Sequence, residues 1–239
     1  MKRNSILYLL TTLLFVSCSM TKNIPEDDQL FTGLKKIEYL DERKDSFETH
    51  LENTKLELEA ALATVPNGSL FGSSYISVPW SWHLWVYNQF SKKESKFAKW
   101  MTKSFGKPPV LMSQVNPTLR ASVAKSVLRN NGYFRGDVGF EIIPQKNPKK
   151  SKIRYAVRLD SLFTLDSVAY VNFPDTIQQL IDSTSQESLI KKGNVFSIGA
   201  LDGERSRISA LLRNNGYYYY NPSYASYLAD TLAVANKDS

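Results

Sequence analysis

The pattern of apolar and polar positions changes from helical to strand periodicity at two places, and the same phrase marks both. It is Leu-Arg-Asn-Asn-Gly-Tyr-Phe at 128–134 and Leu-Arg-Asn-Asn-Gly-Tyr-Tyr at 212–218. Glycine adopts the left-handed conformation after a last helical turn at no steric cost, so Gly132 and Gly216 are predicted helix stops. Tyr133 and Tyr217 are then the first residues of a strand. The pattern therefore predicts a helix–strand unit that is used twice.

Around the first copy, the periodicity predicts a strand, a helix, an irregular insert, a helix and two strands. Leu30 to Leu40 is the candidate first strand, with Gly33 as an irregularity, and Phe47 to Ala63 is an amphipathic helix. The second helix begins at Asn116-Pro117, because Asn is a good cap and Pro suits a first turn. Its expected apolar face comprises Leu119, Val123, Ala124, Val127 and Leu128. Two alternating runs around the loop 144–152 then predict a β-hairpin, with Val138, Phe140, Ile142, Ile153, Tyr155, Val157 and Leu159 as its apolar positions.

A second unit is expected from residue 161 onward. Val168, Tyr170 and Phe173 lie in a strand-like run, and Thr176 to Ile190 has a helical pattern. A further helix opens at Leu201, with Asp202 as the expected cap, and ends at the second phrase. Only 232–234 could supply the third strand that the first unit has, so this sheet is expected to be incomplete.

The N-terminus has the features of an export signal. Lys2 and Arg3 precede a short apolar run from Ile6 to Val16, which is too short to span a membrane comfortably. Ser17 and Cys18, the sole cysteine of the chain, follow the run as in a bacterial lipobox. Fatty acyl chains such as palmitate on Cys18 would anchor the protein stably, because two chains are enough for this. The alternative is an incidental cysteine in an uncleaved signal anchor.

Composition narrows the class of protein but does not identify a ligand. The chain has 239 residues, which suits one or two domains, and its formal net charge of +7 favours anionic surfaces of any kind. A single cysteine excludes an intramolecular disulfide. The two histidines, His50 and His83, are far apart and lack companion ligands, so we expect no metal site and no cofactor.

The insert from 69 to 107 combines aromatic residues with six lysines at 92, 93, 96, 99, 103 and 107. At helical spacing, one interpretation is a helix on a membrane surface, with aromatics at headgroup depth and lysines on phosphates. The other is an ordinary helix that packs Trp100 onto a core and exposes its lysines to solvent.

The charged residues near the start of the helix that opens at Leu201 do not form a catalytic cluster. Asp202, Glu204, Arg205 and Arg207 are explained by capping and a solvated helix face. The sequence contains no nucleophile–base pair and no Gly-rich phosphate loop, so the protein is not expected to be an enzyme. The basic loop 146–152 could touch nucleic acid, which an exported protein seldom meets.

The order of strand, two helices and two strands, with Gly-Tyr-aromatic after the second helix, resembles a POTRA domain, the polypeptide-transport-associated module. The amino-acid sequence resembles the BamA/TamA family of outer-membrane assembly factors, and within it the TamL-like lipoproteins of Bacteroidota. The similarity covers nearly the whole chain, and four stretches carry it. They are 18–22 with Pro25 and 30–33, Gly106 to Leu111, the phrase at 128–134, and 201–218 with the second phrase, followed by Asp230-Thr231. Members of that family continue into further POTRA units and a C-terminal β-barrel, which this chain does not contain. The barrel would then be missing or separately encoded.

The resemblance implies an α+β fold of two tandem POTRA-like βααββ domains after a lipoprotein signal peptide, the second domain being incomplete. The expected boundaries are 1–17 for the signal peptide, 18–29 for a linker, 30–160 for the first domain and 161–235 for the second. It implies a lipid-anchored outer-membrane protein with its body in the periplasm. Its partners would be unfolded outer-membrane proteins or envelope assembly subunits.

Clients would add as strands at a sheet edge, a mode of binding called β-augmentation. The candidate edge residues are Val138, Phe140, Ile142, Val168 and Tyr170. Two alternatives remain open, namely a structural adaptor in the cell envelope that handles no clients, and a truncated remnant of a barrel protein.

Overall fold

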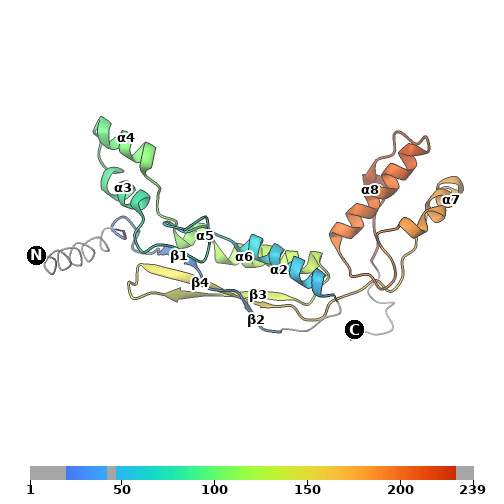
Figure 1. The fold of residues 1–239 in the computed structure, drawn as a ribbon, viewed down its shortest axis with the longest axis horizontal. Helices are drawn as coiled ribbons and strands as arrows, with labels where there is room; N and C mark the ends of the chain where they lie inside the picture. The colour runs from blue at the N-terminus through green and yellow to red at the C-terminus, as the bar shows by residue number, and fades with distance from the viewer. Residues whose placement is uncertain (1–19, 42–46, 230–239) are drawn as a thin grey trace, which may run out of the picture. The chain divides into compact units, whose positions relative to one another are not determined.

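The computed structural model describes residues 20–41 and 47–229, which form two compact units. Within these residues, the first unit takes the chain up to Ala124 together with Val138–Arg158. The second takes Lys125–Asp137 together with the chain from Leu159 on. The signal peptide and Cys18 lie outside the described residues. The architecture is α+β, as expected (Figure 1).

The sheet of the first unit is built around β4 (Lys150–Arg158). β1 (Leu30–Leu34) and β2 (Glu38–Tyr39) both pair parallel with β4, in the register Leu30 to Lys150 and Glu38 to Ala156. β3 (Asp137–Pro144) pairs with β4 as the first strand of a hairpin. Gly33, at φ +121°, lies where the β1–β4 register shifts. The expected first strand is thus two short strands with an irregularity between them.

β1 and β2 pair with one edge of β4, and β3 pairs with the other edge. The carbonyls of Lys149, Ile153 and Val157 accept hydrogen bonds from the N–H groups of Leu30, Lys35 and Leu40. These acceptors are odd-numbered, so they face the same edge of the strand. The first unit therefore has a sheet in which β4 is central and β3 forms an outer edge.

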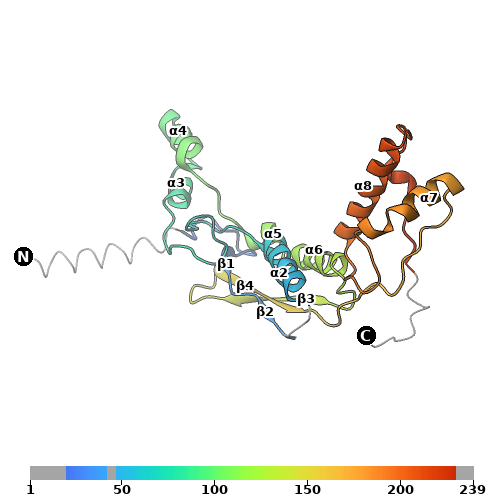
Figure 2. The same ribbon diagram turned by 45° about the vertical axis from the view of Figure 1, so that its right-hand side comes forward.

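Helices cover one face of this sheet (Figures 1 and 2). α2 (Glu48–Leu62) buries Leu51, Leu58 and Leu62, as its periodicity predicts. The short α5 (Met112–Val115) leads into α6 (Pro117–Asn130), and Asn116 accepts a hydrogen bond from the Leu119 N–H as the expected cap. The buried face of α6 differs from the prediction. It holds Ala121, Ala124 and Leu128, whereas Leu119 and Val123 are exposed.

The insert forms a helical hairpin of α3 (Trp82–Phe90) and α4 (Lys96–Phe105). Trp100 is 54% exposed, so the interpretation that packs it onto a core is wrong. The segment predicted as a linker is also not a linker throughout. Met20 and Ile24 form a buried apolar cluster with Leu30 and with Leu84 of α3.

The second unit contains helices and no strand between 159 and 229. It has α7 (Asp175–Ser183), a 3₁₀ turn at Ser185–Glu187, α8 (Ile198–Asn214) and another 3₁₀ turn at Pro222–Tyr224. Its core contains Ile181, Ile208 and Leu212, with partly buried side chains packed against them. The expectation of a second βααββ set is therefore not met in these residues. The described part of this unit instead has an isolated antiparallel β-bridge between Thr164 and Val195.

Both copies of the repeated phrase end a helix in the same way. Tyr133 N–H donates to the Leu128 carbonyl at 2.9 Å, and Tyr217 N–H donates to the Leu212 carbonyl at 3.0 Å. Gly132 and Gly216 have φ of +87° and +95°. This is the Schellman motif, in which glycine lets the chain reverse while the last carbonyls stay hydrogen-bonded. The predicted helix stops are confirmed.

Candidate functional site

Strand β3 brings together three of the candidate edge residues. Val138, Phe140 and Ile142 lie within Asp137–Pro144, and Phe140 and Ile142 are both exposed to more than a third of their area. Among the residues that the structure describes, β4 is the strand that pairs with β3, and no other strand lies against it. An apolar edge of this kind is a template for a further strand.

The register of the hairpin decides which backbone groups face outward. Gln145 N–H donates to the Lys150 carbonyl at 3.0 Å, and the side chains of Glu141 and Arg154 form an ion pair at 2.6 Å. These two pairs have the same register, in which odd-numbered residues of β3 bond to β4. Since backbone groups alternate along a strand, those of Phe140 and Ile142 point away from the sheet.

The side chains of Phe140 and Ile142 lie on the face of the sheet that the helices cover. The ring of Phe140 is 6.4 Å from that of Tyr155, which is fully buried. Glu141 and Arg154 are on the opposite face, where both are exposed. An added strand would thus meet free backbone groups along its length, and half-exposed apolar side chains on one face.

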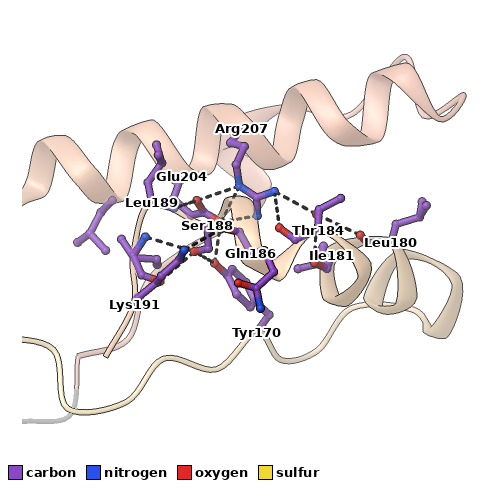
Figure 3. A network of polar contacts seen from close by, with 12 residues as sticks. Tyr170, Leu180, Ile181, Thr184, Gln186, Ser188, Leu189, Lys191, Glu204 and Arg207 are labelled. Carbon is purple, nitrogen blue, oxygen red and sulfur yellow. Dashed lines mark hydrogen bonds and ion pairs between the residues drawn. The ribbon is translucent and has the colours of Figure 1, made fainter. Parts of the chain in front are cut away.

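The other two candidate edge residues, Val168 and Tyr170, do not lie in a strand. Their run has no neighbouring strand to pair with between 159 and 229, so its alternating pattern is not used for a sheet. Tyr170 packs against the helical core of the second unit instead. Its hydroxyl belongs to a polar network around Glu204 (Figure 3). The prediction of an edge at these positions is therefore wrong.

Glu204 is the centre of this network and has no exposed area. Its carboxylate accepts hydrogen bonds from the Tyr170 hydroxyl at 2.6 Å and from the Leu189 N–H at 2.8 Å. The Arg207 guanidinium donates to both carboxylate oxygens, with Nη2 to Oε1 at 2.6 Å and Nε to Oε2 at 3.0 Å. The interpretation of Glu204 as part of a solvated helix face is thus wrong.

Neighbouring groups extend the network across the second unit. Arg207 Nη1 donates to the Thr184 hydroxyl at 3.1 Å, at the end of α7. Ser188 Oγ lies 2.8 Å from the Tyr170 hydroxyl and donates to the Ile190 carbonyl at 2.8 Å. Figure 3 shows the side chain of Arg207 directed from α8 toward this cluster. The network therefore ties α8 to the chain between 170 and 190.

The electrostatics of Glu204 indicate a structural role. Burial raises the pKa of its carboxyl, but hydrogen bonds from Arg207, Tyr170 and the Leu189 N–H outweigh burial and hold the pKa below its ordinary value. Burial, with the hydrogen bond to Glu204, raises the pKa of Tyr170. A carboxylate kept ionised and surrounded by donors is a fixed acceptor rather than an acid that exchanges protons.

The local sequence explains how α8 reaches this position. α8 begins at Ile198 and is capped by Ser197, so Asp202 lies inside the helix and is not its cap. Gly203 faces Leu189, and a Cβ there would be 3.0 Å from the Leu189 Cδ1. The absence of a side chain at Gly203 lets the 188–190 segment approach α8 closely. This glycine next to a glutamate was the available sign of the network in the sequence.

The remaining site expectations concern metals, membranes and relatives. No group of three or more His, Cys, Asp and Glu in the described residues is placed to hold a metal ion. Within the same ranges, no helix is long and apolar enough to cross a membrane. Neither known family models nor curated proteins match this chain.

Proposed function

We propose that this chain is a POTRA-type module of an outer-membrane protein assembly factor. Acyl chains on Cys18 would hold it at the outer membrane, with its body in the periplasm. It binds extended segments of unfolded clients or partner subunits by β-augmentation along β3. The single observation behind this proposal is the open edge of β3, where Phe140 and Ile142 combine outward backbone groups with half-exposed apolar side chains.

The topology of the first unit supports the proposal. Leaving aside α3, α4 and α5 between α2 and α6, the order is strand, helix, helix and hairpin, with β4 central and parallel to the first strands. This is the order of elements that the resemblance to a POTRA domain implies. Backbone pairing at an edge depends weakly on client sequence, which suits a protein that receives many different chains.

The proposal concerns the first unit. Because residues 159–229 contain no strand, they offer no sheet edge for a client.

A proline at position 142 tests the edge directly. Ile142→Pro removes an outward N–H without removing a bond to β4, and proline is tolerated on edge strands. Ile142→Ala is the matched control, because it loses the side chain and keeps the N–H. We expect Ile142→Pro to weaken binding of extended barrel-protein peptides about three- to tenfold relative to Ile142→Ala, as one hydrogen bond is lost. Fluorescence anisotropy measures this.

Cross-linking in cells separates client handling from a purely structural adaptor. A photoreactive residue in place of Phe140 should cross-link to newly exported barrel proteins, whereas one in place of Glu52, an exposed residue of α2, should not. Cross-links confined to resident envelope subunits would favour the adaptor. Equal binding by Ile142→Pro and Ile142→Ala would contradict β-augmentation at β3.

A further inference from the structure

The α3–α4 hairpin exposes a continuous group of aromatic side chains. Phe97 is 61% exposed and Trp100 is 54% exposed, and Trp82 and Phe105 are also exposed. Their rings contact one another in the series Phe90, Phe97, Trp100, Phe105, Trp82 and Trp85, with centroid distances of 5.7 to 6.3 Å. Exposed aromatic groups of this extent mark an interaction surface. We refer to these six residues as the aromatic face.

Lysines flank the aromatic face. Residues 92–107 contain six lysines and one acidic residue, Glu94, which is a net charge of 6 − 1 = +5. Lys96, Lys99 and Lys103 are exposed and follow one side of α4. Phe97, Met101 and Phe105 recur at helical spacing on the opposite side, so α4 is strongly amphipathic. This combination is typical of helices that lie in a membrane interface.

The hairpin is a formed structure and not an unpacked end. Ser81 and Ser95 cap the two helices, accepting hydrogen bonds from the Leu84 and Ala98 N–H groups. His83 Nδ1 lies 2.9 Å from the Phe105 carbonyl, which joins α3 to the end of α4. Ala98 is buried. The two helices thus pack together partly through the ring pairs Trp82–Phe105 and Phe90–Phe97, and they leave Phe97 and Trp100 more than half exposed.

The expected anchor is attached to the same hairpin. Met20 and Ile24 are buried against Leu84 of α3, and Asn88 Nδ2 donates to the Met20 carbonyl at 3.1 Å. Cys18 is two positions before Met20 in the sequence. Acyl chains on Cys18 would enter the bilayer, and the segment that follows would bring α3 to the membrane surface.

We propose that the α3–α4 hairpin docks on the anionic phospholipid surface in which Cys18 is anchored. Phe97, Trp100 and Phe105 enter at headgroup depth, and Lys96, Lys99 and Lys103 contact phosphates. This inference rests on the lipid attachment included in the proposed function. Docking would hold the first unit at a defined distance from the bilayer through a second contact, beside the lipid tether.

The positive charge of the α3–α4 hairpin favours an anionic phospholipid surface over a second copy of the chain as its binding partner. Two hairpins would bring net charges of +5 together, whereas anionic headgroups attract each lysine near the surface. Tryptophan also favours a location with one apolar and one wet side, as at headgroup depth.

Site-specific labelling tests the proposal on the full lipidated protein in vesicles. Cys18 is the sole cysteine and is blocked when acylated, so Phe97→Cys accepts an environment-sensitive fluorophore selectively. Leu119→Cys is the matched control, because Leu119 is 59% exposed on a helix of the same unit but lies outside the lysine-rich hairpin. We expect a blue-shifted, brighter emission at position 97 in vesicles of phosphatidylglycerol and phosphatidylcholine, and little change at position 119.

Charge removal and detergent complete the test. Lys96→Gln, Lys99→Gln and Lys103→Gln should each weaken docking about fivefold, and pure phosphatidylcholine should weaken it further. Equal emission at 97 and 119 in anionic vesicles would overturn the proposal. In dilute detergent, blue-shifted emission that grows with protein concentration would indicate self-association and would also overturn it. Labelling at Cys18 itself in the native chain would instead contradict the lipid attachment of the proposed function.

Discussion

The two copies of the repeated phrase have the same local structure and different surroundings. Each ends its helix with a glycine at positive φ and the same hydrogen bond from the following tyrosine. Tyr133 is 1% exposed and leads into β3, whereas Tyr217 is 37% exposed and leads into an irregular segment. The phrase therefore determines the helix stop, and the surrounding segments determine whether a strand comes after it.

Gly132 and Gly216 show the same contrast. A Cβ on Gly132 would lie 2.8 Å from the Phe196 carbonyl oxygen and 3.2 Å from that of Phe163, and nothing lies within 4 Å of one on Gly216. Phe163 N–H also donates to the Gly132 carbonyl at 3.0 Å. The first copy is enclosed by other segments, and the second is open to solvent. A capping motif alone does not show which of its copies has a packing role.

Corresponding positions in α6 and α8 carry charged side chains that attach the two helices to their neighbours by different hydrogen bonds. Glu204 in α8 corresponds to Arg120 in α6, because 204 − 84 = 120 and the phrases are 84 residues apart. Arg120 Nη1 donates to the Ala61 and Ala63 carbonyls at 3.2 and 2.9 Å, at the end of α2. Glu204 accepts from three groups in the second unit. Each helix thus has a charged side chain here, one satisfying carbonyls and the other N–H and O–H donors.

The largest expected contrast comes from truncating the two tyrosines. Tyr133→Ala should lower the free energy of unfolding by about 3–5 kcal/mol, because it empties a buried aromatic site. Tyr217→Ala, at an exposed site, should cost less than about 1 kcal/mol. Urea denaturation of the full chain followed by circular dichroism measures both. Equal losses would mean that the second copy is packed as well as the first.

The glycines give the next largest contrast. Gly132→Ala adds the strain of positive φ to a collision with the Phe196 carbonyl, and we expect it to cost about 3 kcal/mol or more. Gly216→Ala has the same strain without the collision and should cost about 1 kcal/mol. Hydrogen exchange at the ends of α6 and α8 measures the two effects separately. Similar effects would contradict the difference in enclosure.

Glu204→Gln is expected to have a smaller effect than Tyr133→Ala and Gly132→Ala. Losing charged hydrogen bonds should destabilise α8 by about 1–3 kcal/mol at neutral pH. The folded pKa of Glu204 lies below its ordinary value of 4.5, so its contribution is complete above that pH and is lost as the pH falls through the folded pKa. The difference between native chain and variant should therefore shrink in acid. Hydrogen exchange of α8 at neutral and acidic pH tests this, and a constant difference would contradict it.

Local patterns predicted much of the first unit. The periodicity of α2, the cap at Asn116 and the alternation around 144–152 each involve residues close in sequence, and the structure has all three. The predicted face of α6 is wrong at Leu119 and Val123, because these residues are as apolar as the buried ones. Choosing between two apolar stripes requires knowing where the rest of the unit lies.

Predictions that depended on distant partners were less successful. Val168 and Tyr170 have a strand-like pattern, but a strand needs a neighbour to satisfy its backbone, and the described second unit contains none. Glu204 is buried beside Tyr170 and Leu189, which lie 34 and 15 positions away from it in the sequence. Apart from the neighbouring Gly203, nothing in the helix itself distinguishes Glu204 from a solvated glutamate.

By itself, the sequence determined the helix stops, the cap at Asn116 and the hairpin, because each depends on interactions within a few residues. Only the tertiary structure decided which apolar faces are covered, since burial depends on segments that are distant in the chain. It exposed the aromatic face of α3 and α4, left the outer edge of β3 open and enclosed Glu204. These three outcomes depend on how apolar area and hydrogen-bonding groups are shared among segments, which no single segment specifies.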